Sequence, residues 1–146
     1  MTRSGNVGSS IKKKVTQLTK KFDTCNPFEI AEALGIEILY EDLGKILGYY
    51  NKVFRIPIIH INEVSTEQQQ LFTCAHELGH AVLHPNENTS FLKSNTHFST
   101  DRIEVEANTF AIELLFAQGA VGHVTVHEAT EVYGIPEQLL IKNFYT

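Results

Sequence analysis

The sequence has little cysteine, no tryptophan and no long apolar run. Its two cysteines, Cys25 and Cys74, show no paired spacing, which argues against a disulfide framework and favours a reducing, cytoplasmic setting. No segment approaches the roughly 18 apolar residues of a membrane span. The N-terminal stretch MTRSGNVGSSIKKKV is polar and lacks the apolar core of a secretory signal. We therefore expect a cytoplasmic protein.

An excess of basic residues is also missing. The 12 lysines and arginines are outnumbered by 17 aspartates and glutamates, so the formal net charge is −5. Without an overall positive field, the chain has no general attraction to nucleic acid or to anionic membranes. The 42% hydrophobic and 20% charged residues are typical of a globular protein, and a chain of 146 residues suits one domain.

The pattern of apolar residues predicts an α+β fold, in which helices surround a small sheet formed early in the chain. Residues 1–10 are expected to be disordered. Residues 11–146 are expected to form a single domain, to which residues 124–146 contribute a pair of short helices. No internal repeat or long linker divides the chain.

Local signals mark the first elements of this domain. Asn26 as N-cap, Pro27 in the first turn and Gly35 at the C-terminal cap delimit a short helix. Strands are predicted at IEILY and at VFRIPIIHINE, and a turn with a short strand is predicted between them at LGKILGYYNK. Pro57, in the strand VFRIPIIHINE, has no N–H to donate, so we expect it at a sheet edge or at a strand end.

The stretch FTCAHELGHAVLHP, residues 72–85, places three histidines and a glutamate in an otherwise apolar run. Ser65 followed by Gln68 is a capping-box signal that opens a helix. Pro85 disfavours helical geometry in the residue before it. The sequence therefore predicts a helix from about Thr66 to His84, and the question is whether its histidines bind a metal or simply form a solvated edge.

His76 and His80 can ligate one ion, because residues four apart on a helix differ by about 40° of rotation and 6 Å of rise. Glu77 lies between them around the helix, and the pattern His-Glu-x-x-His indicates two imidazole ligands and a carboxylate base. Gly79 either lets another segment pass close to the metal or simply weakens the helix by about 1 kcal/mol. His84 lies about 12 Å along the axis from His76, so we expect it to interact with the terminal carbonyls instead.

A catalytic zinc keeps three protein ligands and one open position, so a third ligand must come from elsewhere. The candidates downstream are His97, Asp101, Glu104 and Glu106. In DRIEVEANTFAIELL, Glu104 lies beside the apolar stripe, whereas Glu106 and Glu113 fall on the side expected to face solvent. Periodicity therefore favours Glu104, and His97 stays a candidate because a loop can fold back. Asn108, one turn after Glu104, can hydrogen-bond a ligand histidine and fix its orientation.

The segment HELGHAVLH followed by EVEANTFAIELL resembles the ImmA/IrrE family of zinc metallopeptidases. The resemblance includes the strand IPIIHIN and covers residues 25 to 120 or more. It implies a zincin-like fold and one Zn²⁺ held by His76, His80 and Glu104, with Glu77 as the base and Asn108 as support for a ligand. The family's usual ELLMP is replaced here by ELLFA, which alters the end of this helix and leaves the metal residues intact.

The resemblance also implies a function, because family members known as antirepressors cleave a phage-type repressor. We therefore expect a zinc endopeptidase whose partner is such a repressor, with no direct contact to nucleic acid. Negative charge developing on the scissile carbonyl needs a donor, for which Tyr49, Tyr50 and His97 are candidates. The strand around Ile58–Ile61 is either a plain core strand or one that aligns the substrate backbone by strand addition.

Two rival interpretations remain at this point. The first keeps the zinc without catalysis, in a protein that binds and sequesters the repressor. The second takes VHEATEVYGIPEQLLIKNF as a helix-turn-helix that binds DNA. Glu128, Glu131 and Glu137 against the single Lys142 make that segment a poor match for phosphate contacts. A structural zinc usually has four protein ligands, which disfavours the first rival.

Overall fold

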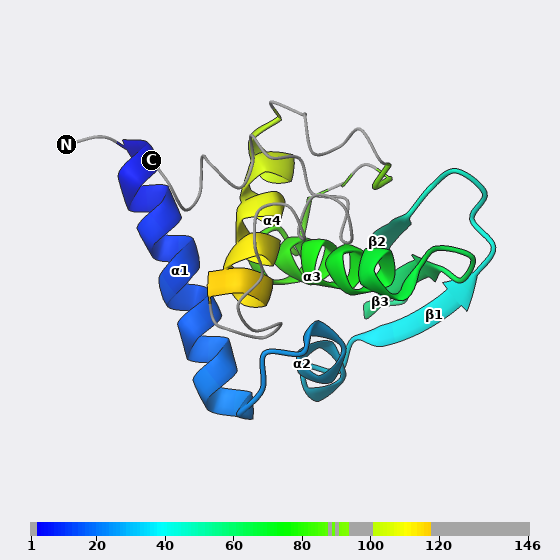
Figure 1. The fold of residues 1–146 in the computed structure, drawn as a ribbon, viewed down its shortest axis with the longest axis horizontal. Helices are drawn as coiled ribbons and strands as arrows, with labels where there is room; N and C mark the ends of the chain where they lie inside the picture. The colour runs from blue at the N-terminus through cyan, green and yellow to red at the C-terminus, as the bar shows by residue number, and fades with distance from the viewer. Residues whose placement is uncertain (1–2, 88, 90, 94–100, 118–146) are drawn as a thin grey trace.

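The computed structural model describes residues 3–87, 89, 91–93 and 101–117, and its helices and strands confirm the α+β fold class. The expected helical pair at 124–146 and the candidate His97 lie outside these residues. Figure 1 shows α3 at the centre of the molecule, with the strands on one side and α4 and α1 on the other. The elements are α1 (Arg3–Phe22), α2 (Pro27–Ala33), β1 (Glu37–Glu41), β2 (Gly48–Val53), β3 (Ile56–Asn62), α3 (Glu67–Leu83), α4 (Arg102–Ile112) and the π-helical turn η2 (Glu113–Ala117).

The described strands form a three-stranded sheet in the order β1-β3-β2, so β3 is central. β1 pairs with β3 in parallel and β2 pairs with it antiparallel. Strand addition along Ile58–Ile61 is therefore wrong, because both sides of β3 are already paired. Pro57 is the second residue of this central strand, so its expected place at a sheet edge was wrong and its place at a strand end was right. β1 begins opposite Ile58, so no ladder bond is lost at the proline.

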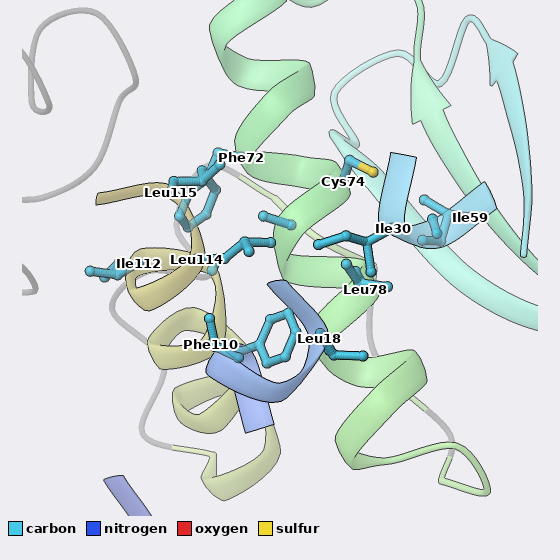
Figure 2. Close-up of a cluster of buried hydrophobic side chains, with 14 of the residues drawn as sticks. Leu18, Ile30, Ile59, Phe72, Cys74, Leu78, Phe110, Ile112, Leu114 and Leu115 are labelled. Atoms are coloured by element: carbon cyan, nitrogen blue, oxygen red, sulfur yellow. The ribbon is translucent and has the colours of Figure 1, made fainter. Parts of the chain in front are cut away.

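The hydrophobic core lies on both sides of α3. Ile59 and Ile61 of β3 are fully buried, and alternation along a strand turns both to the same face of the sheet. Figure 2 shows Leu78 of α3 close to Ile30 of α2, with Leu18 of α1 and Phe110 of α4 nearby. α3 is thus a central helix that contacts the sheet and α4 together, which explains why its apolar stripe is wide.

Gly79 lies where α3 and α4 cross. A Cβ built on Gly79 would lie 3.1 Å from the Cβ of Phe110, closer than ordinary van der Waals contact. Of the two interpretations of this glycine, close passage of another segment is the one that the structure supports. The segment that passes is α4, which also carries Glu104.

The helices end at capping residues of the expected kinds, and the N-cap of α3 is displaced by one residue. The N-cap of α3 is Thr66, which forms a capping box with Gln69, one residue later than predicted because both residue pairs match the pattern. Ser65 instead donates its hydroxyl to the Asn62 carbonyl. Asp101 is the N-cap of α4, and His84 caps α3 before Pro85.

The N-terminal helix α1 begins earlier in the chain than we expected. α1 already begins at Arg3, whereas residues 1–10 were expected to be disordered. The core contacts of Ile11, Val15 and Leu18 stabilise a helix that then extends by one hydrogen bond for each residue added. Among the described residues, no helix has the length and apolar character needed to cross a membrane.

Candidate metal centre

Side chains from α3 and α4 converge at one point in the interior. His76, His80 and Glu104 each bring a potential ligand atom to within 4.8 Å of the other two, and among the described residues they form the one group of this kind. Glu104 Oε1 lies 3.0 Å from His76 Nε2 and 3.2 Å from His80 Nε2. The two rings are 4.8 Å apart, centroid to centroid, as the four-residue spacing on α3 requires.

The cluster is buried, and the pKa values of its side chains are shifted by burial and by their neighbours. His76 and His80 are completely buried and Glu104 is 3% exposed. Burial lowers the pKa of His76, which favours the neutral ring. Burial acts to raise the pKa of Glu104, but hydrogen bonds and charge from His76 and His80, which need protons on the Nε2 atoms, outweigh it and lower that pKa to about 2. A metal ion would replace those Nε2 protons, because it binds neutral imidazoles and an ionised carboxylate.

Asn108 orients one of these rings. Its Oδ1 lies 2.8 Å from His76 Nδ1, so in the metal-binding form the neutral ring donates from Nδ1 and has its lone pair on Nε2. That lone pair faces the Glu104 carboxylate, an arrangement of acceptors that suits a cation between them. The second oxygen of Glu104, Oε2, is also buried and lies 3.1 Å from His80 Nε2. The residues present therefore fit a zinc ion, for which two histidines and a carboxylate are a common ligand set.

Glu77 is the most unusual carboxylate among the described residues. It is completely buried, and neither of its oxygens has a hydrogen-bond partner. Burial and the nearby charge of Glu104 raise its pKa well above the ordinary value. A buried polar group without a partner is costly in a folded protein, and such groups cluster at functional sites.

The side-chain contacts of His84 were not predicted from the sequence. We expected this residue to contact helix-terminal carbonyls, but its ring lies 3.0 Å from His80 Nδ1 on one side and 2.7 Å from Glu106 Oε1 on the other. The expectation that Glu106 and Glu113 face solvent was also wrong, because the Glu106 side chain is only 17% exposed and contacts His84, and Glu113 is 8% exposed. The recurrence of histidine at four-residue steps was the available signal, since it places all three rings along one face of α3.

Of the candidate oxyanion donors, Tyr49 and Tyr50 make other contacts, and His97 lies outside the described residues. Tyr49 stacks on His60 with 4.0 Å between ring centroids, and Tyr50 is a buried residue of the core. Both line a cavity of about 620 Å³ that extends to Phe91 and Glu87. In the described part of the chain, neither tyrosine hydrogen-bonds to a residue of the metal cluster. The ligand candidate Asp101 instead accepts the N–H of Ile103 as a helix cap.

Comparisons with known proteins agree with this geometry. A model of a peptidase family, described as the IrrE N-terminal-like domain, matches residues 31–140. The chain is 41% identical over 135 residues to uncharacterized immunity region protein 2 of Bacillus phage phi105, covering 88% of this chain and 85% of that protein. It is 39% identical over 107 residues to metallopeptidase ImmA of Bacillus subtilis (strain 168), covering 72% of this chain and 62% of ImmA.

Proposed function

Because the chain belongs to the family of IrrE N-terminal-like peptidases, we propose that it is a zinc-dependent endopeptidase with a zincin-like fold, and that its substrate is a phage-type repressor. The observation that carries the proposal is the meeting of His76 and His80 from α3 with Glu104 from α4. One relative is named an immunity region protein and another a metallopeptidase, and both names suit an enzyme that relieves repression of a mobile element. The family membership also confirms the resemblance seen in the sequence.

His76, His80 and Glu104 would hold the zinc ion. Two imidazoles and one carboxylate match the three protein ligands of a catalytic zinc site, whereas a structural zinc usually has four. The ion supplies a Lewis acid and a positive charge that lowers the pKa of nearby water and of nearby acids. The lowered pKa values of His76 and Glu104 favour the neutral ring and the ionised carboxylate, which are the forms that bind a metal ion.

Glu77 acts as the general base. It follows His76 directly and precedes His80 by three residues on α3, and the charge of the third ligand, Glu104, acts on it. The unpartnered oxygens of Glu77 are free to accept a proton from the attacking water and to deliver it to the leaving amine. Burial raises the pKa of Glu77, which makes its carboxylate a stronger base than an ordinary glutamate.

The outer edge of β2 is where a substrate backbone would pair. Gly48, at the start of β2, already accepts a hydrogen bond of 2.8 Å from the N–H of Leu92 on this edge. Backbone groups alternate in direction along a strand, so Tyr50 and Lys52 face the same side as Gly48. β2 also approaches α3 one turn before His76, because a Cβ on Gly48 would lie 2.5 Å from Thr73 Cγ2. Main-chain pairing along this edge would align a peptide by strand addition.

The proposal is tested with the zinc-loaded chain, candidate phage-type repressors and mass spectrometry of the products. We expect the wild-type chain to produce defined repressor fragments. Glu77→Gln should bind zinc with the same stoichiometry and produce none, because an amide cannot accept the proton. Cleavage by Glu77→Gln at the wild-type rate would refute the assigned base. A repressor that is bound and remains intact with the wild-type chain would instead support sequestration without catalysis.

A further inference from the structure

A continuous line of hydrogen-bonding groups leads from the ring of His80 to the protein surface. His80 Nδ1 lies 3.0 Å from His84 Nδ1, and His84 Nε2 lies 2.7 Å from Glu106 Oε1. Arg102 then donates to the same oxygen of Glu106 over 3.2 Å. His80 and His84 are 0% and 4% exposed, so the first link of this line is shielded from water.

We propose that His84 and Glu106 are positioning residues, which fix the tautomer and the ring orientation of His80 so that its Nε2 lone pair faces the metal position. This inference rests on the metal site of the proposed function and extends it beyond the ligands. His84 and Glu106 would act on the metal only through His80.

The positions of the protons follow from the acceptors at each step. The Glu106 carboxylate can only accept, so the proton of a neutral His84 ring is on Nε2. His84 Nδ1 then carries a lone pair and must accept from His80 Nδ1–H. His80, protonated on Nδ1, is left with a lone pair on Nε2, the atom 3.2 Å from Glu104 Oε1. A single negative charge on Glu106 therefore determines the tautomers of two histidines.

The same line ties the two helices together at the site. His84 is the C-cap of α3, and its backbone N–H donates to the His80 carbonyl over 2.8 Å, which limits movement of the residue. Glu106 is on α4, two residues after Glu104. This helix therefore carries both the ligand Glu104 and the residue that supports the ligand His80 of α3. A ring held at both of its functional edges loses less entropy when an ion binds.

His84 is not itself placed to bind the ion. Both of its ring nitrogens already face protein groups, Nδ1 toward His80 and Nε2 toward Glu106. Its ring centroid is 5.2 Å from that of His80, and it is absent from the group of converging ligand atoms. A supporting role for the third histidine explains its burial and its two contacts together.

The test measures Zn²⁺ affinity of the purified full chain by competition with a chromophoric chelator, so it does not depend on a cleavage assay. His84→Phe keeps a ring of similar size and removes both hydrogen bonds, and we expect it to bind zinc roughly 10–100-fold more weakly than wild type. His84→Asn restores an oxygen acceptor near the position of Nδ1 and should recover part of the affinity. Glu106→Gln removes the charge and should weaken binding by roughly 10-fold.

Glu87→Gln is the matched control. The Glu87 side chain accepts from Arg102 over 3.4 Å at the exposed end of the line, and only its backbone N–H, which the substitution keeps, donates to the His84 carbonyl, so this variant should bind zinc as wild type does. The melting temperature of each metal-free variant shows whether it is folded, so that weaker zinc binding is not confused with poor folding. If His84→Phe does not fold, the zinc affinity of Glu106→Gln tests the positioning role. Nitrogen-15 NMR of the zinc-loaded wild type should find His84 protonated on Nε2.

Equal zinc affinity of wild type, His84→Phe and Glu106→Gln overturns the positioning role and leaves the metal site and the peptidase proposal standing. A His84 ring protonated on Nδ1 in the zinc-loaded protein overturns it as well. A wild-type chain that binds no zinc refutes the proposed function itself, and the positioning role with it.

Discussion

Asn108 Oδ1 lies 2.8 Å from Nδ1 of His76, and both side chains are almost completely buried. Asn108 is one helical turn after Glu104 on α4, so this helix supplies a potential ligand and the support for another. The contact uses the proton-bearing nitrogen of His76 and leaves the other nitrogen toward the cluster. The orientation of the ring is therefore set before any ion binds.

We expect Asn108→Leu to weaken zinc binding, because His76 would lose the acceptor that fixes its tautomer. The loss should be about 10–100-fold, the usual effect of removing such a supporting residue. Asn108→Asp keeps an oxygen acceptor and should retain most of the affinity. Competition with a chelator measures both, and an Asn108→Leu variant as tight as wild type would show that the contact does not orient the ring.

Removal of the third ligand should have a larger effect. Glu104→Ala takes away the carboxylate that faces both rings, and we expect the purified variant to contain almost no zinc by elemental analysis. Glu106→Ala changes only support for a ligand, so at saturating metal it should still hold about one zinc per chain. Loss of the metal in Glu106→Ala alone would contradict the assignment of Glu104.

The site could be predicted from the sequence where local geometry decides it. The four-residue step from His76 to His80 is a property of any helix, and the apolar stripe of the later helix indicated Glu104 as the inward carboxylate. The contact between His84 and Glu106 was missed because it depends on how α3 and α4 cross. Periodicity within one helix gives no crossing angle, and a residue on the flank of a helix can still be covered by its neighbour.

The order of the strands in the sheet could not be predicted from local sequence patterns either. Each strand was expected from its own residues, but the order β1-β3-β2 depends on long-range pairing that no local pattern encodes. Pro57 suggested an edge strand, since proline lacks a ladder donor. In the structure that donor is missing at the start of β3, before β1 begins opposite Ile58, so a central strand tolerates it.

Gly48 is expected to be the glycine least tolerant of substitution. A Cβ at this position would lie 2.5 Å from the backbone oxygen of His60 and 2.5 Å from Thr73 Cγ2. The carbonyl belongs to the central strand and cannot move without breaking the sheet, so Gly48→Ala should lower the melting temperature by about 6 °C or more, which corresponds to about 2 kcal/mol or more.

Gly8→Ala is the matched control for Gly48→Ala. Gly8 lies in α1, and no heavy atom is within 4 Å of a Cβ built there. Alanine is favoured over glycine inside a helix by about 1 kcal/mol, so this variant should melt at the same temperature as wild type or higher. Thermal melts followed by circular dichroism compare the two, and equal melting temperatures would refute the close approach of β2 to α3.

Glu113 should make the stability of the metal-free chain depend on pH. It is 8% exposed, its Oε2 has no hydrogen-bond partner, and burial raises its pKa above the ordinary 4.5, although the charge of Lys12 opposes the effect. Below pH 4.5 the folded and unfolded chains both hold the proton, so Glu113 contributes no difference. As the pH rises, the unfolded chain releases its proton first, and folding loses stability until the pH passes the folded pKa. Glu113→Gln should therefore be more stable than wild type at pH 7.5 and equally stable at pH 4, as urea unfolding of the two metal-free proteins would show; a stability difference that is the same at both pH values would rule out a buried charge as its cause.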